Sequence, residues 1–140
     1  MRKKKYREFK RGQVVYVDLG KRPPGVEGGL RPCVVVSSNE SNHCYAPQIT
    51  VCPLSSKLKD ISVHVQIRPR EVKGYPLKTV SDLLPEDIQT IPKTSVRAEL
   101  GYISENSTAM QQVNNALIKQ LGLIDFTRKL LEKDRNEGGH

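Results

Sequence analysis

The 140-residue sequence lacks tryptophan, has only two phenylalanines and contains no long apolar run. The core must therefore be aliphatic, built mostly from Val, Ile and Leu. A membrane-spanning helix needs about 18 to 20 consecutive apolar residues, and no stretch approaches that length. The basic residues 1–5 are not followed by the apolar segment of a secretory signal. We therefore expect a protein of about one domain that neither crosses a membrane nor carries an export signal.

Cysteine is also scarce. Cys33, Cys44 and Cys52 make an odd count, and no two of them form a C-x-x-C pair. This count and spacing fit neither a disulfide framework nor a zinc site, and the histidines show no metal-ligand spacing. We expect idle thiols in a reducing cytoplasm, with no metal or other cofactor.

Acidic residues are in the minority, with 15 Asp and Glu against 23 Lys and Arg, which gives a formal charge of +8. This excess predicts an anionic partner such as nucleic acid, an acidic protein segment or a membrane surface. Residues 1–10 form a basic arm that also holds Tyr6 and Phe9. Such an arm can bind nucleic acid through phosphates and stacked bases, or it can be a loosely ordered, solvated tail. Both interpretations stay open.

Strand patterns come first along the chain and helical patterns last. Segments rich in β-branched residues predict strands at 13–18, 31–37, 48–54 and 62–67, and shorter ones at 79–84 and 88–91. An apolar stripe predicts a helix over 107–121, with Ser104 or Ser107 as its cap and Gly122 at its end. A short terminal helix near 124–131 then leads into a polar tail, 134–140. The expected class is α+β, a strongly curved antiparallel sheet or small barrel with helices at one end.

Two short segments are candidates for chemistry. In residues 28–32 (GGLRP), two glycines lead to an arginine at a strand start, a combination that suits phosphate binding. In residues 53–57 (PLSSK), two hydroxyls and a lysine follow a strand end. Taken alone, each segment is more typical of an ordinary loop. His43 and His64 could form an acid–base couple, although each is more typical of a surface histidine.

In combination, these segments resemble the MazF/PemK family of type II toxin–antitoxin endoribonucleases. The similarity follows the family's order from about residue 10 to 123, in RGQVVYVDL (11–19), GGLRPCVVV (28–36), ITVCPLSSK (49–57), LPEDIQTI (84–91) and ALIKQLGL (116–123). The chain is accordingly divided into the basic arm (1–10), a toxin domain (11–123) and a C-terminal helical extension with a polar tail (124–140).

The resemblance implies an SH3-like, curved antiparallel β-barrel with C-terminal helices, working as a homodimer. It implies metal-independent, sequence-specific cleavage of single-stranded RNA by attack of a 2′-OH, which leaves a 2′,3′-cyclic phosphate and a 5′-OH. The family's essential arginine falls on Arg31, and its active-site hydroxyl, usually a threonine, falls on Ser55. The implied partner is a cognate antitoxin whose acidic, disordered C-terminal segment lies along the RNA groove.

Further roles follow from the same resemblance. Glu27 is expected to contact a base or to assist proton transfer, and the expected RNA contacts are Gly28, Gly29, Ser56, Lys57 and Gln89. Asp87 and Gln89 differ from the residues that relatives often carry, which would alter the accepted RNA sequence. Serine at position 55 keeps the hydroxyl but lacks the β-branch that fixes χ1, which predicts lower activity.

Two other functions fit a small basic barrel. A gyrase poison on the same barrel would not need the arginine at 31 or the hydroxyls at 55 and 56, so their presence argues against it. A nucleic-acid-binding module would bind RNA and DNA alike, with a steep dependence on salt and no cleavage.

Overall fold

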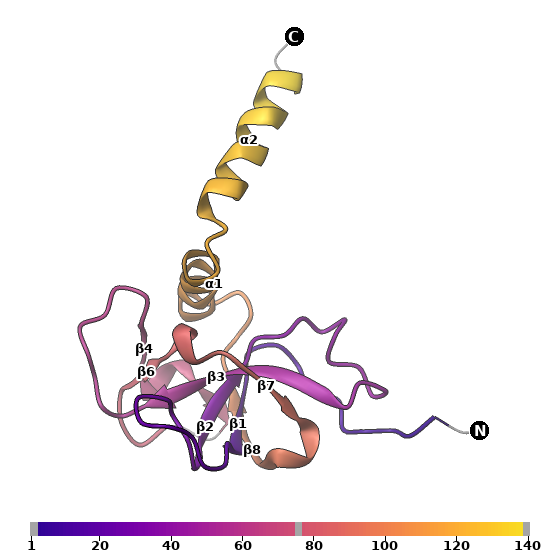
Figure 1. Ribbon diagram of the computed structural model, residues 1–140, viewed down its shortest axis with the longest axis vertical. Helices are drawn as coiled ribbons and strands as arrows, with labels where there is room; N and C mark the ends of the chain where they lie inside the picture. The colour runs from indigo at the N-terminus through magenta and orange to yellow at the C-terminus, as the bar shows by residue number, and fades with distance from the viewer. Residues whose placement is uncertain (1–2, 75–76, 139–140) are drawn as a thin grey trace.

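The computed structural model describes residues 3–74 and 77–138, in which a curved antiparallel sheet carries two helices (Figure 1). The strands pair in the order β4-β6-β3-β2-β1-β8-β5, and β7 pairs with β3 as well. This arrangement confirms the expected α+β class. The strands are β1 (Gln13–Asp18), β2 (Leu30–Val35), β3 (Gln48–Ser55), β4 (Val65–Ile67), β5 (Lys73–Gly74), β6 (Ser81–Leu83), β7 (Gln89–Pro92) and β8 (Val96–Tyr102).

The structure contains all six predicted strands, and β1 has the predicted bounds. The predicted strand at 62–67 is shorter, because β4 begins only at Val65. The sequence analysis missed β5 and β8. The signal for β8 was present, because Val96, Ala98 and Leu100 alternate with charged residues as a half-buried strand requires.

The central strands bury side chains on both faces of the sheet. One face belongs to a cluster that includes Val14, Val34 and Cys52, and the opposite face to a second cluster that includes Val15, Cys33 and Val51. When both faces of a strand are buried, its sequence is a continuous run of apolar residues. This double burial explains why these strands show no clean alternation in the sequence.

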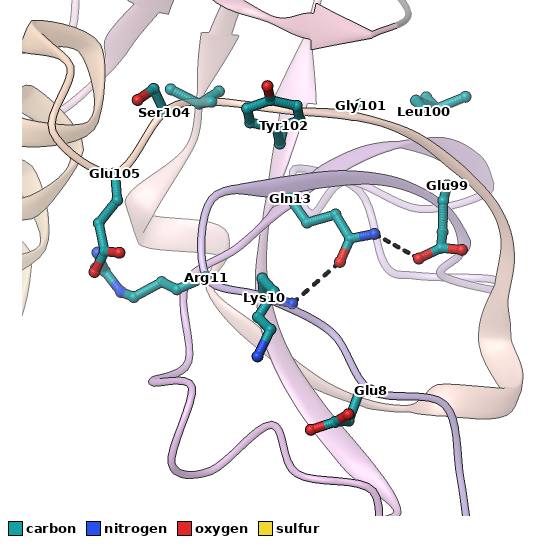
Figure 2. Close-up of a pocket in the computed structure, with 11 residues that line it drawn as sticks. Glu8, Lys10, Arg11, Gln13, Glu99, Leu100, Gly101, Tyr102, Ser104 and Glu105 are labelled. Carbon is teal, nitrogen blue, oxygen red and sulfur yellow. Dashed lines mark hydrogen bonds between the residues drawn. The ribbon is translucent and has the colours of Figure 1, made fainter.

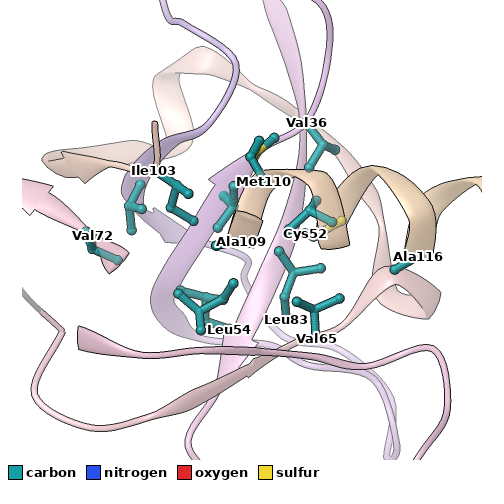
Figure 3. Packing of buried hydrophobic residues seen from close by; sticks show 14 of the residues in the cluster. Val36, Cys52, Leu54, Val65, Val72, Leu83, Ile103, Ala109, Met110 and Ala116 are labelled. Atoms are coloured by element: carbon teal, nitrogen blue, oxygen red, sulfur yellow. The ribbon is translucent and has the colours of Figure 1, made fainter. Parts of the chain in front are cut away.

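Helix α1 (Thr108–Gln120) covers the first of these clusters (Figure 3). Its cap is Ser107, whose Oγ accepts the Met110 N–H at 3.1 Å. Ala109, Met110 and Val113 are buried members of this cluster, and Figure 3 shows Ala109 and Met110 within it. The predicted helix, its apolar stripe and one of its two candidate caps are therefore confirmed.

Helix α2 (Ile124–Gly138) extends away from the sheet (Figure 1). The predicted terminal helix is confirmed, but it is longer than expected, because the segment from Asp134 onward continues the helix through Gly138. Charged residues such as Lys, Arg and Glu are good helix formers, so the polar composition of this segment does not end the helix. No helix in the described part of the chain has the length and apolarity needed to cross a membrane.

The basic arm is anchored to the sheet from Tyr6 onward. The Tyr6 N–H donates to the Cys44 carbonyl at 2.6 Å, and Arg7 Nη2 donates to the Val96 carbonyl at 2.9 Å. Phe9 belongs to the second cluster and is 1% exposed. The interpretation of this arm as loose is therefore wrong for these residues, and Phe9 cannot stack on a base.

Replacing Phe9 with alanine is expected to lower the free energy of unfolding by about 3 kcal/mol, because a buried ring leaves a cavity that the surroundings fill only in part. Urea denaturation followed by circular dichroism measures this change. The exposed Lys5 is the control, and Lys5→Ala should change stability by less than about 0.5 kcal/mol. Equal stability of the Phe9→Ala variant and the wild type would show that the arm is not part of the core.

Candidate active site

The turn between β1 and β2 delivers Arg31 to the start of β2. The Leu19 N–H donates to the Gly29 carbonyl at 2.9 Å, and the Gly29 N–H donates to the Gly20 carbonyl at 2.8 Å. Gly29 has φ +72°, which favours glycine, and a Cβ on Gly28 would lie 2.8 Å from the Gly20 carbonyl oxygen. The turn itself therefore requires both glycines.

Arg31 is held from two sides near the surface. Its Nη1 lies 2.5 Å from Glu27 Oε2, and its Nε donates to the Gly28 carbonyl at 2.9 Å. The side chains of Arg31 and Glu27 are 26% and 27% exposed. Glu27 is in turn fixed by its own N–H, which donates to Asp87 Oδ2 at 3.3 Å. The guanidinium is thus oriented yet open to an approaching anion.

Ser55 ends β3 and is 6% exposed. Its Oγ accepts the Lys57 N–H at 3.2 Å, which is a local serine turn. Ser55, Lys57 and Glu27 line a small cavity of about 60 Å³, together with His64 and other residues. Residues with a hydroxyl, a carboxylate and an amine in their side chains therefore line this cavity.

Arg31 and Ser55 lie on neighbouring strands. Cys33 of β2 pairs with Pro53 of β3, and continuing this register along both strands brings Arg31 level with Ser55. The two residues line different cavities, because Arg31 lies with Ser56 at a larger one of about 600 Å³. Glu27 joins them, since it lines the Ser55 cavity and binds Arg31.

Gln89 is less directly connected to this site. It lies on β7 opposite Val51 of β3, and it does not line either of the two cavities. Its amide nitrogen and oxygen are buried and have no hydrogen-bond partner among the described residues. The structure therefore brings Glu27, Ser55 and Lys57 to one cavity, and Arg31 and Ser56 to the next, while Gln89 lies apart.

The contacts of His64 could not be foreseen from the sequence. It is not a surface histidine, because its side chain is only 4% exposed and contacts two carboxylates, those of Asp82 and Glu86. His43 is exposed, as expected, and its Nδ1 accepts the Tyr45 N–H. The one available signal for His64 was its position within the strand predicted at 62–67, since a polar residue there can face a neighbouring strand as easily as solvent.

A larger cavity, of about 730 Å³, lies elsewhere, between the segment before β1 and the end of β8 (Figure 2). Figure 2 shows Gln13 between Lys10 and Glu99, with a hydrogen bond of 2.5 Å to the Glu99 carboxylate. Burial lowers the pKa of Arg11, and the neighbouring Glu105 partly offsets this effect. None of the predicted site residues lines this cavity.

The cysteines offer a separate test of the core. Burial raises the pKa of Cys33 and of Cys52 to about 12, because a thiolate in the core loses its hydration. The thiolate is the species that alkylating reagents attack. At pH 8 we expect iodoacetamide to label folded protein at the half-buried Cys44 before the other two, and all three cysteines after unfolding. Mass spectrometry of the peptides would detect the opposite result, labelling of Cys33 or Cys52 at the rate of Cys44.

Comparisons with known proteins agree with this architecture. A protein-family model described as "PemK-like, MazF-like toxin of type II toxin-antitoxin system" matches residues 10–121. An endoribonuclease from a mycobacterial species, solved in complex with its cognate antitoxin, is 26% identical, and the match covers 81% of this chain and 93% of that one with a TM-score of 0.62.

A MazF from Deinococcus radiodurans shares the fold at 19% identity, with a TM-score of 0.67 over 83% of this chain and 98% of that one. These matches confirm the expected curved antiparallel barrel with C-terminal helices and the resemblance drawn from the sequence. The protein belongs to the PemK-like, MazF-like toxins of type II toxin–antitoxin systems.

Proposed function

We propose that this toxin is a metal-independent, sequence-specific endoribonuclease that cuts single-stranded RNA. The observation that supports it most is that Glu27, which binds Arg31 at the start of β2, also lines the cavity of Ser55 at the end of β3. In this reaction the ribose 2′-OH attacks the adjacent phosphorus, so the substrate supplies its own nucleophile. The bond to the 5′-oxygen breaks and this oxygen takes up a proton from solvent, so the products carry a 2′,3′-cyclic phosphate and a 5′-OH.

Negative charge grows on the non-bridging phosphate oxygens as phosphorus becomes five-coordinate. Donors aimed at those oxygens lower the barrier, because they bind the transition state more strongly than the substrate. Arg31 offers a planar set of N–H groups that matches two phosphate oxygens, and the Ser55 hydroxyl adds a neutral donor. We assign to Arg31 electrostatic stabilisation in preference to proton donation, because a guanidinium is too weak an acid to give up its proton readily.

Glu27 is the group placed to handle the proton of the 2′-OH. Its carboxylate binds Arg31, and Glu27 lines the same cavity as Ser55. When a phosphate takes its place on Arg31, the carboxylate is released close to the reacting atoms and can accept a proton. The Glu27–Arg31 ion pair thus holds the guanidinium in position until RNA binds.

Five other residues are expected to contact RNA, and two of them line these two cavities. Ser56 and Lys57 lie on successive positions after Ser55 and would bind the backbone on either side of the cut phosphate. Gly28 and Gly29 allow RNA to approach the turn before Arg31 closely. Gln89 would have to act from β7, where its unpartnered amide could bind a base after a small movement.

The same proposal includes the assembly. We infer a homodimer in the cytoplasm, inhibited by a cognate antitoxin whose acidic, disordered C-terminal segment folds onto the RNA-binding surface. The formal charge of +8 suits both that segment and RNA. Size-exclusion chromatography with light scattering, and pull-down after co-expression with the product of the adjacent open reading frame, test these two statements.

The activity is tested by incubating the purified protein with a long unstructured RNA in the presence of EDTA. We expect discrete fragments, and no cutting of DNA of the same sequence. Equal binding of RNA and DNA without cleavage would instead support a nucleic-acid-binding module. Inhibition of gyrase supercoiling with intact RNA would support a gyrase poison.

A further inference from the structure

The loop that joins β3 to β4, residues 56–64, carries Lys57 and Lys59 to the rim of the Ser55 cavity. All but the last two of its residues are exposed, and Leu58 and Ile61 are 49% and 42% exposed. Such a loop buries too little apolar surface to order itself by packing. Polar contacts must therefore fix the two lysines.

Two of those contacts end on one buried carboxylate. Asp82 is 1% exposed and lies on β6, where it pairs with Ser55 of β3. Its Oδ2 accepts the Lys59 N–H at 2.9 Å and lies 3.2 Å from His64 Nδ1. A buried carboxylate needs such donors, because its desolvation is otherwise costly. Asp82 thus holds the loop near its middle and at its end.

The other ring nitrogen of His64 points at a second carboxylate. His64 Nε2 lies 2.5 Å from Glu86 Oε2, and Glu86 belongs to the short 3₁₀ helix Pro85–Asp87. The imidazole ring therefore bridges the two carboxylates, with one ring nitrogen at each of them. Removing this ring would leave both carboxylates without their shared partner.

The same short helix also contacts the turn before Arg31. Asp87, next to Glu86, accepts the Glu27 N–H, and Glu27 binds Arg31. A continuous set of contacts therefore runs from Asp82 through His64 and the 3₁₀ helix to Glu27. It links the loop that carries the lysines to the turn that carries the arginine, across the Ser55 cavity.

We propose that His64 is a positioning residue, which fixes the 56–64 loop against Asp82 and Glu86 so that Lys57 and Lys59 meet the RNA backbone beside Ser55. This inference rests on the proposed function for the identity of the ligand. The placement of the loop itself does not depend on it. We expect the effect of His64 to fall on substrate binding and not on the chemical step, because the lysines attract phosphate equally in the substrate and in the transition state.

Two variants test it. His64→Gln retains a donor near Nε2 but loses the contact with Asp82. Glu86→Ala removes the other contact at a side chain that is 35% exposed, with little risk to folding. For both we expect KM for a short RNA substrate to rise by about 10-fold, with kcat within about 3-fold of wild type, because one charge-assisted hydrogen bond is lost. His43→Gln, at an exposed histidine, is the matched control and should change neither constant.

Limited trypsin digestion measures how often the 56–64 loop opens, and it needs no RNA, because Lys57 and Lys59 are themselves cleavage sites. We expect cutting after these lysines to be about 10-fold faster in both variants than in wild type or His43→Gln, since local opening sets the rate. Equal digestion rates, or a loss of kcat at unchanged KM that follows the melting temperature, would overturn the proposal. Failure of the wild type to cut RNA would overturn the proposed function, while the digestion rates would still decide the loop's placement.

Discussion

Arg31→Ala is expected to reduce RNA cleavage by about 1000-fold, because in the proposed mechanism the variant loses the charged donor to the phosphate in the transition state. The loss should appear in kcat and in kcat/KM alike, as it does when an interaction made mainly in the transition state is removed. Single-turnover cleavage of a fluorescent RNA measures it. Growth arrest on expression of the toxin should disappear in parallel.

The fold should survive this change. The Glu27–Arg31 pair is about one-quarter exposed, and pairs of this kind contribute about 0 to 1 kcal/mol to stability. Arg97→Ala, at an exposed arginine on β8, is the matched control and should cut RNA like wild type. If Arg31→Ala is folded and still cleaves within about 10-fold of wild type, the guanidinium is not the main source of stabilisation.

Ser55→Ala should slow cleavage by about 100-fold, because it removes one neutral donor to the same oxygens. The hydroxyl also accepts the Lys57 N–H, so the variant loses about 1 kcal/mol of stability from this local contact. Ser55→Thr keeps the hydroxyl and should retain cleavage. Gel analysis of initial rates for the three proteins separates the effect of the hydroxyl from that of side-chain size.

The exposed Ser41 provides a control for serine-to-alanine replacement in general. Its alanine variant should match wild type in rate and melting temperature. A Ser55→Ala protein as active as wild type would remove this hydroxyl from the mechanism. The role of Arg31 would then have to be explained by Glu27 and the lysines of the 56–64 loop.

Local patterns were sufficient to predict most secondary structure. The β-branched run at 13–18 and the apolar stripe of α1, with its cap at Ser107, depend on neighbours in the sequence, so they could be found without knowing the fold. Phe9 could not be assigned in this way. Its burial depends on β-strands far along the chain, and a basic segment around it gave no sign of an apolar contact.

The residues of the candidate site also differ in whether the sequence alone could predict their contacts. Arg31 and Ser55 were brought together by the resemblance to a family, because nothing in a single sequence states that β2 and β3 are neighbours. The contact between His64 and Asp82 had no such support, since it arises where β3, β4 and β6 pair. The resemblance to a family therefore suggested the candidate reacting groups, and only the pairing of the strands shows which side chains surround them.

The central claim is that the RNA's own 2′-OH is the nucleophile beside Arg31 and Ser55. The most direct test compares a short RNA substrate with the same oligonucleotide carrying a single 2′-deoxy nucleotide on the 5′ side of the cut bond. The account predicts that the all-RNA strand yields fragments with 2′,3′-cyclic phosphate and 5′-OH ends, and that the substituted strand stays intact at that position. Cleavage of the substituted strand, or products with 5′-phosphate ends, would contradict it.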